Sequence, residues 1–144
     1  MTPTGSPKSE IDYHIEGIDF DLAQAEMLSN WIKKTIAAEG QVLESLNFIF
    51  CSDEYLHKIN VDYLNHDTLT DVITFPYSEI NVEGDIFISI DRIRENAINF
   101  DTTFETELHR VMIHGVLHLC GYGDKTEAEA QQMRAKEAEY LSKL

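Results

Sequence analysis

The sequence predicts an α+β fold, a single domain in which a small mixed sheet packs with helices. A length of 144 residues suits one core. Short runs in which apolar and polar residues alternate predict strands, and longer runs with helical spacing predict helices, which dominate the C-terminal half. No repeat, low-complexity tract or Pro/Gly-rich linker divides the chain. We therefore expect residues 1–144 to form one domain, with residues 1–9 as a frayed tail.

The N-terminal half is expected to contain a strand, a helix, a strand and a helix, in that order. Gly40 closes the first helix, because glycine readily takes the left-handed conformation that ends many helices. Ser52 and Asp53 are N-cap candidates for the second helix. The expected elements are a strand at 11–15, a helix at 22–36, a strand at 43–51 and a short helix through residue 63.

The C-terminal half is expected to contain two strands followed by three helices. A polar stretch with Asn81 and Gly84 separates the two strand-like runs, and its length allows an antiparallel return. The expected elements are strands at 71–77 and 85–90, a helix from a cap at Asp91 to about Phe100, a helix from Thr103 to Cys120 with a Thr102–Glu105 capping box, and a last helix after a Thr126–Glu129 capping box.

Composition and charge exclude several classes of function. A net charge of −15 opposes any function that needs a broad basic surface, so a nucleic-acid role must work locally. No segment approaches the ~20 apolar residues of a membrane span, and the N-terminus lacks a basic region before an apolar run. We therefore expect no membrane partner and a cytoplasmic location. Cys51 and Cys120 are expected to be buried thiols and not a disulfide.

The segment HGVLHLCGYGD carries the clearest chemical signal in the chain. His114 and His118 are four residues apart on a predicted helix, so both imidazoles can face one ion. Gly121 suits the left-handed end of that helix and lets the chain return with Asp124. Two histidines and one carboxylate leave a coordination position open for water, as in catalytic zinc sites. We expect one divalent ion, zinc first, at the C-terminal part of a central helix, a zincin-like arrangement.

Core histidines bonded to backbone are the ordinary alternative to this metal site. The helix around His114 and His118 is apolar on several faces, where two unpaired imidazoles are costly, so we favour the ligand interpretation. Gly115 stands where the H-E-x-x-H motif of zinc peptidases has its general-base Glu. A metallopeptidase is therefore the least favoured function.

Three blocks of sequence resemble the YbeY family of bacterial rRNA maturation factors. They are HGVLHLCGYGD, TDVITFPY at 70–77 and GDIFIS at 84–89, and the resemblance spans about residues 53–124. It implies a metal-dependent, single-strand-specific endoribonuclease that acts in maturation of the 16S rRNA 3′ end and in ribosome quality control. The implied partners are single-stranded rRNA, the small ribosomal subunit and an assembly GTPase.

Two residues depart from the pattern of that family. Asp124 stands where the family has a third histidine, and this oxygen ligand keeps manganese, nickel or iron possible beside zinc. Leu64 follows Tyr63 where the family usually has an arginine suited to a phosphate. Together with the charge of −15, Leu64 favours an alternative function: a metal-binding ribosome-assembly factor with weak or no nuclease activity.

Other polar residues are weaker site candidates. His114 is expected to be catalytic as well as a ligand, and Arg110, four residues before it, can reach a substrate oxygen as a second catalytic residue, although a surface salt bridge is its more ordinary role. Asp71 and Asp85 are about equally suited to hydrogen-bond a ligand histidine or to cap local turns. His66 falls in a polar loop and is the weakest candidate.

The expected reaction is hydrolysis of a phosphodiester bond by water. The ion lowers the pKa of the water and polarises the phosphoryl oxygen, so no protein base need be named. Phe75 or Tyr77 offers a stacking face for an RNA base beside the strand Gly84–Ser89, although core packing explains both aromatic residues equally well.

Overall fold

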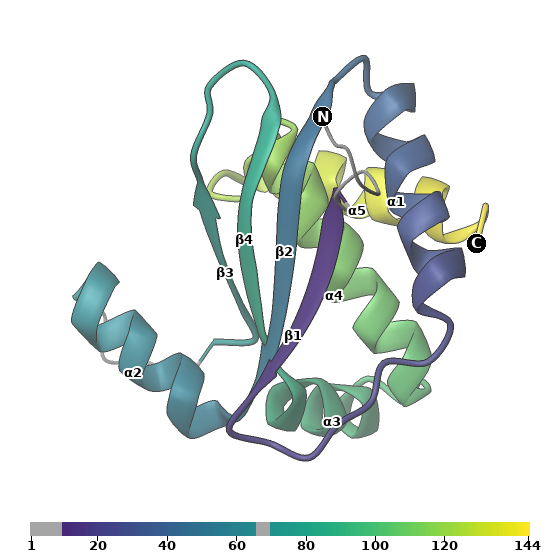
Figure 1. Ribbon diagram of the computed structural model, residues 1–144. Coiled ribbons are helices and arrows are strands. Elements are labelled where there is room, and N and C mark those ends of the chain that lie inside the picture. Colours follow the sequence, from purple (N-terminus) through teal and green to yellow (C-terminus); the bar gives the residue numbers. More distant parts are fainter. Residues whose placement is uncertain (1–9, 66–69) are drawn as a thin grey trace.

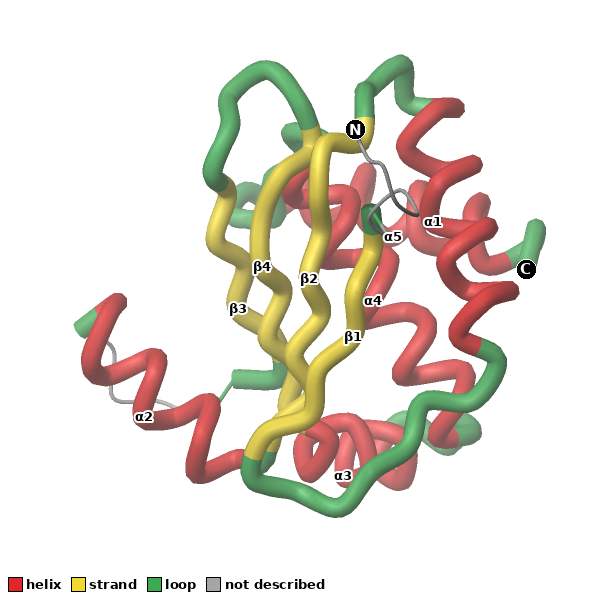
Figure 2. Tube along the Cα trace, viewed as in Figure 1, coloured by secondary structure: helices red, strands yellow, loops and turns green. Residues whose placement is uncertain are grey.

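The computed structural model describes residues 10–65 and 70–144, so the expected tail at 1–9 and the candidate His66 lie outside the described residues. Within the described residues the order of strands and helices is the predicted one (Figures 1 and 2). None of these helices combines the length and the apolar composition needed to cross a bilayer. The elements are β1 (Ile11–Glu16), α1 (Ala25–Ala38), β2 (Leu43–Cys51), α2 (Asp53–Leu64), β3 (Val72–Pro76), β4 (Val82–Ser89), α3 (Ile90–Asn99), α4 (Phe104–Leu119) and α5 (Glu127–Leu141).

The strands form one mixed sheet in the order β1-β2-β4-β3. β2 pairs in parallel with both β1 and β4, whereas β3 runs antiparallel to β4. Parallel neighbours require a crossover connection, and α1 supplies it between β1 and β2. The return from β3 to β4 needs only a short turn. The expected mixed sheet and antiparallel pair are therefore confirmed.

Helix α4 lies behind the sheet in the view of Figure 1 and forms the core with it. Alternate residues of β2 and β4 point toward this helix and are fully buried, among them Phe48, Phe50, Ile86 and Ile88. Each such side chain contributes roughly 1.5–3 kcal/mol when it leaves water. Because α4 is held by this layer, the residues on its flank have a fixed position beside the sheet.

Two glycines allow α4 to approach β4 closely. A Cβ atom on Gly115 would lie 2.9 Å from Cγ2 of Ile86, and one on Gly84 would lie 2.5 Å from the backbone oxygen of Phe75 and 3.2 Å from Leu119. Gly84, expected in the turn, is therefore part of β4, which begins three residues earlier than predicted. Glycine suits both positions because a Cβ at residue 115 would press on the side chain of Ile86, and a Cβ at residue 84 would press on the backbone of β3 and the side chain of Leu119.

Replacing Gly84 by alanine is expected to destabilise the protein more than the same change at Gly115. The clash at Gly84 is with backbone, which cannot move without breaking the ladder, whereas Ile86 can shift at Gly115. We expect losses of roughly 3 and 1 kcal/mol, within the range for overpacking. Urea unfolding of the two variants measures the difference. An equal loss of unfolding free energy in the two variants would contradict this account of the contacts at the two glycines.

Two helices begin at residues other than those predicted. The hydroxyl of Ser89 caps α3 in place of Asp91, and the hydroxyl of Thr103 caps α4 in place of Thr102. In each case a second cap-forming residue stands one or two positions away, and only the backbone direction at the helix entrance decides between them. The capping box of Thr126 and Glu129 at the start of α5 is confirmed.

Candidate metal centre

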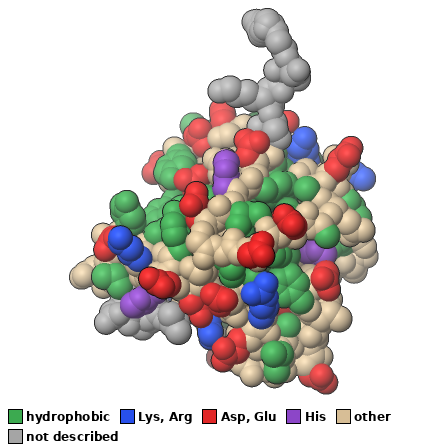
Figure 3. Space-filling view, turned by 60° about the horizontal axis from the view of Figure 1, so that its bottom comes forward, with side chains coloured by type: hydrophobic (Ala, Val, Ile, Leu, Met, Phe, Trp, Pro, Cys, Tyr) green, Lys and Arg blue, Asp and Glu red, His purple; other side chains and the backbone are tan. Residues whose placement is uncertain are grey.

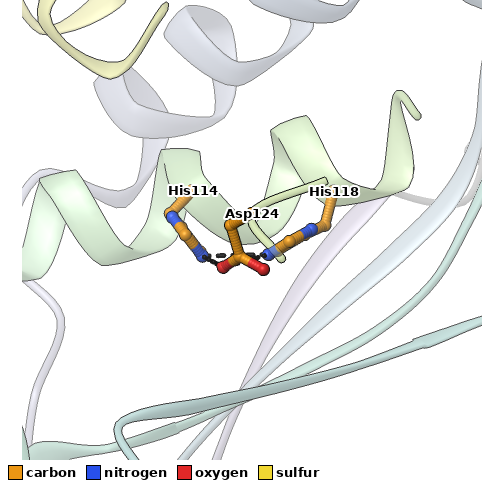
Figure 4. Close-up of side chains that lie close together, drawn as sticks. All are labelled: His114, His118 and Asp124. Carbon is orange, nitrogen blue, oxygen red and sulfur yellow. Dashed lines mark hydrogen bonds and ion pairs between the residues drawn. The ribbon is translucent and has the colours of Figure 1, made fainter. Parts of the chain in front are cut away.

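Three ligand atoms from His114, His118 and Asp124 meet at one point beside α4. The two histidines extend from the last turns of the helix, and Asp124 comes from the turn that follows (Figure 4). The Nε2 atoms of the histidines are 2.9 Å apart, and Oδ2 of Asp124 is 3.3 Å from each of them. In the part of the chain that the structure describes, this is the one group of three or more His, Cys, Asp or Glu side chains arranged to hold an ion.

The separations of these atoms fit a tetrahedral zinc ion. Ligands about 2.0–2.1 Å from zinc are roughly 3.3 Å from one another when the geometry is tetrahedral. Both separations between Nε2 and Oδ2 of Asp124 agree with that value. The two Nε2 atoms need to part by only roughly 0.4 Å. The residues present therefore fit a divalent ion with a fourth position left for water or substrate.

The second nitrogen of each imidazole is used by a partner that only accepts hydrogen bonds. Nδ1 of His118 donates to the backbone oxygen of Tyr122 at 2.8 Å, and Nδ1 of His114 donates to Oε2 of Glu137 at 2.6 Å. In the neutral imidazoles both protons are then on Nδ1, so both Nε2 lone pairs face the carboxylate of Asp124. Three acceptors pointing at one another are unfavourable unless a cation lies between them.

Glu137 is a partner of the candidate ligand His114 that sequence reasoning missed. It belongs to α5 and is buried together with Met133 and Tyr140, with a side chain only 6 % exposed. The spacing of Met133, Glu137 and Tyr140 is that of one helix face, so the sequence places a charged residue on an apolar stripe. That conflict was the available signal, because a buried carboxylate requires a partner.

Arg110 binds two buried carboxylates. Its Nη2 lies 2.7 Å from Oε2 of Glu107, and its Nη1 lies 3.2 Å from Oε1 of Glu137. Hydrogen bonding to Glu107 raises the pKa of Arg110 and outweighs the opposing effect of burial, so the guanidinium stays charged. The salt-bridge alternative is therefore what the structure shows. Arg110 holds Glu137 against His114, and a direct role with substrate stays a prediction.

Asp71 lies on the same side of the molecule as the metal centre but does not bond to it. Burial raises the pKa of Asp71, while the positive charge of Arg110 acts in the opposite direction. Its carboxylate accepts a hydrogen bond from Nδ2 of Asn96 at 3.4 Å. Among the described residues it is Glu137, and not Asp71, that orients a ligand histidine. A role for Asp71 beside the substrate stays a prediction.

Asp85 points away from the metal centre, so of the roles considered for it the structure does not support the bond to a ligand histidine, and a weak role beside the substrate stays a prediction. Its neighbours on β4 face α4, and the two-residue period of a strand turns Asp85 to the opposite face. There it accepts hydrogen bonds from Nδ2 of Asn47 at 3.1 Å and from the hydroxyl of Tyr77 at 2.6 Å. The bond to Asp85 raises the pKa of Tyr77 to about 12. Phe75 pairs across the sheet with Asp85, so the expected stacking residues are also on this face.

This opposite face carries a groove of about 360 Å³ between α2 and the β3–β4 pair. Its lining is mainly aromatic, and Tyr63 and Tyr77 expose more than half of their surface. The groove is lined by Tyr55, Ile59, Tyr63, Phe75, Tyr77, Asp85 and Phe87. The sheet therefore separates the stacking candidates from the histidines.

Cys120 follows the metal helix directly but does not behave as a ligand. Burial raises the pKa of Cys120 to about 12, so the thiol stays protonated near neutral pH, whereas metals bind the thiolate. Burial likewise raises the pKa of Cys51 to about 12. Both cysteines are free, as expected, but only Cys51 is fully buried, whereas Cys120 is partly exposed.

Basic side chains are few and several are paired. In the face shown in Figure 3, acidic side chains are spread among apolar and uncharged ones, and basic side chains are fewer. Arg92 is bonded to Asp53 and Glu95, and no arginine lies between Tyr63 and Arg92. Leu64, at the end of α2, is 39 % exposed. The described residues therefore show no arginine at the position where the resemblance implies one.

Comparisons with known proteins place these features in one family. The model of the family described as Endoribonuclease YbeY matches residues 10–144. A protein named Endoribonuclease YbeY from Amoebophilus asiaticus is 52 % identical over 94 % of this chain and 93 % of its own length. One with the same name from Flavobacterium psychrophilum is 54 % identical over 86 % of this chain and 89 % of its own. The solution structure of TM1509 from Thermotoga maritima matches with a TM-score of 0.68 and 32 % identity, covering 91 % of this chain and 86 % of that one.

Proposed function

Since this chain belongs to the YbeY family, whose members are named endoribonucleases, we propose that it cleaves single-stranded rRNA by hydrolysis with one divalent metal ion. The observation that carries the proposal is the meeting of two Nε2 lone pairs and the carboxylate of Asp124 at one point. The set of two histidines and one carboxylate is that of catalytic zinc sites with an open position. A divalent ion supplies Lewis-acid polarisation of a phosphoryl oxygen and a more acidic water molecule.

The residues at this centre have different roles. His114 and His118 hold the ion through Nε2, while Glu137 and the backbone oxygen of Tyr122 fix the direction of the two rings. Asp124 is 43 % exposed, so the side of the centre that it occupies faces solvent, where a flexible strand of RNA has access. Arg110, Glu107 and Glu137 together carry one excess negative charge, which favours a cation at the histidines.

The proposal includes the ion, the place of action and the partners. Zinc is the first choice, and the carboxylate of Asp124 also suits manganese, iron or nickel. We propose action on the 3′ end of 16S rRNA in the cytoplasm, on the small ribosomal subunit and beside an assembly GTPase, as the resemblance of the three sequence blocks implies. A protein with a charge of −15 has little general attraction for RNA, so binding to a ribosomal precursor is the more economical way to reach the substrate.

Leu64 favours a second candidate function, that of a metal-binding assembly factor with weak or no nuclease activity. The position that the family uses for an arginine carries an aliphatic side chain, and Arg92 and Arg110 are engaged with carboxylates. The function of a metallopeptidase of the H-E-x-x-H type is disfavoured by the sequence and also by the packing around residue 115. Gly115 is pressed against Ile86, so a glutamate side chain has no room there.

Cleavage of a 16S 3′-end fragment separates these functions. We expect metal-stripped protein to be inactive and protein loaded with zinc or manganese to cut the single-stranded fragment, but not the same fragment annealed to its complement. A loaded protein that leaves the fragment intact, free or within purified precursor subunits, supports the assembly-factor function. Cleavage that persists without metal would contradict the proposal.

The Asp124→Ala variant is expected to bind zinc about 10-fold to 100-fold more weakly than the unchanged protein, because only the two histidines remain. Competition with a coloured chelator measures the affinity. Asp62→Ala serves as the matched control, since Asp62 is an exposed aspartate of α2. If both variants keep the affinity of the unchanged protein, Asp124 is not a ligand.

A further inference from the structure

Glu39, distant in sequence from the metal ligands, lies beneath the turn that carries Asp124. It ends α1 as the C-cap, and its side chain is only 10 % exposed. Its carboxylate accepts hydrogen bonds from the hydroxyls of Tyr122, at 2.5 Å, and Tyr140, and from Nζ of Lys136 at 3.3 Å. Burial acts to raise the pKa of Glu39, but these three donors outweigh it and the pKa is lowered, so the group is a carboxylate near neutral pH.

Tyr122 connects Glu39 to the metal centre. Its hydroxyl donates to Glu39, and its backbone oxygen accepts the hydrogen bond from Nδ1 of His118 at 2.8 Å. Its backbone N–H donates to the oxygen of Leu117 at 3.0 Å. One residue is therefore fixed at its side chain by Glu39 and at its backbone by the ligand histidine. A shift of the ring is transmitted directly to the carbonyl that orients His118.

The backbone around Tyr122 needs such an anchor. Gly121 has a φ of +109°, and a Cβ there would meet nothing within 4 Å, so no side-chain packing supports its backbone, whose N–H donates to the oxygen of His118 at 3.0 Å. Gly123 on the other side also lacks a side chain. Beyond Asp124 the chain is fixed again, because Glu129 accepts hydrogen bonds from the backbone N–H groups at the start of α5. Asp124 thus stands between two anchors, Tyr122 and the helix cap.

We propose that Glu39 is a positioning residue of the metal centre: through the hydroxyl of Tyr122 it sets the turn that orients His118 and presents Asp124 to the ion. This inference rests on the proposed metal-binding function. It means that the end of α1, in the N-terminal third of the chain, contributes to metal affinity. The contact between Glu39 and Tyr122 joins residues 83 positions apart.

A purely structural role for Glu39 is the competing explanation, because the same carboxylate also ties α1 to α5. Tyr140 provides the matched comparison. It donates to the same carboxylate through the same chemical group, but it belongs to α5 and, within the described residues, makes no hydrogen bond to the turn. Loss of either hydroxyl removes one hydrogen bond to a buried carboxylate, so the two changes have similar costs to folding. Only the loss at Tyr122 releases the turn.

The test compares Tyr122→Phe with Tyr140→Phe in the full chain. Zinc affinity is measured by competition with a chelator, folding by urea unfolding of the metal-free protein, and the state of His118 by the ¹⁵N shifts of its ring in the zinc-loaded protein. We expect Tyr122→Phe to weaken zinc binding about 10-fold, the lower end of the range for lost partners of metal ligands, and to change the His118 shifts. Tyr140→Phe is expected to lower stability comparably and to leave both metal readouts unchanged.

Glu39→Gln assigns the effect to the carboxylate. Introduced alone, Glu39→Gln is expected to weaken zinc binding. Introduced together with Tyr122→Phe, it is expected to cause no further loss of zinc affinity, because the two residues act through one contact. If Tyr122→Phe does not fold, Glu39→Gln takes its place in the comparison with Tyr140→Phe. Equal effects of the two tyrosine changes on zinc affinity, or no effect of either, would overturn the inference alone. Failure of the unchanged protein to bind zinc, manganese, iron or nickel would overturn the metal-binding function and the inference with it.

Discussion

Replacing His118 by alanine is expected to lower metal affinity by more than about 100-fold and to abolish metal-dependent cleavage. Loss of a residue that merely orients a ligand already costs about 10-fold to 100-fold, and His118 is itself a proposed ligand. The folded structure should survive, because the side chain is 24 % exposed and its other partner is a backbone carbonyl. Metal content after gel filtration and cleavage of the single-stranded fragment measure the two effects.

His109→Ala is the matched control for this experiment. His109 lies on α4 with the proposed ligands, but its ring stands edge-on to Trp31 at 6.3 Å and takes no part in the metal centre. Burial lowers the pKa of His109, so its imidazole is neutral near pH 7 and its loss changes little charge. We expect metal binding and cleavage to be retained. A His118→Ala protein that keeps one ion per chain after gel filtration would refute the assignment of His118.

Replacing Arg110 by methionine is expected to lower the free energy of unfolding by about 3 kcal/mol, because it leaves two buried carboxylates without their cation. The side chains of Glu107 and Glu137 are 3 % and 6 % exposed, so water cannot take the place of the guanidinium. For a domain of this size the Tm falls by roughly 10 °C. Thermal unfolding of the metal-free protein measures the change without a contribution from a bound ion.

Two further variants test this explanation. Arg134→Met removes an exposed arginine of α5 and should change the Tm little. Glu107→Gln, introduced together with Arg110→Met, removes one stranded charge and should recover part of the lost stability. If the effects of Arg110→Met and Glu107→Gln on the free energy of unfolding simply add, the two side chains do not depend on each other and the buried network is not the cause.

The sequence by itself determined the order of elements and the two histidines of the centre. In the strand at 43–51 the apolar residues recur at every second position, and in α4 they recur with the period of a helix. That spacing decides which face of each element is buried. His114 and His118 lie one helical turn apart, so the same local geometry brings their rings together. The position of Asp124 followed from the glycines of a short turn. Such features involve residues close in the chain, where backbone geometry alone sets the distance.

Only the tertiary structure decided what surrounds the histidines. Glu137 contacts His114 from α5, and Glu39 contacts Tyr122 from the end of α1, and no local period connects either residue to α4. Asp85 lies in a block that matches the family, but the register of β4 turns it to the far face of the sheet. Arg110 was placed on the correct side of α4, yet its partners became visible only with α5 in place. Contacts between distant elements depend on how whole layers pack, which one chain's local pattern does not specify.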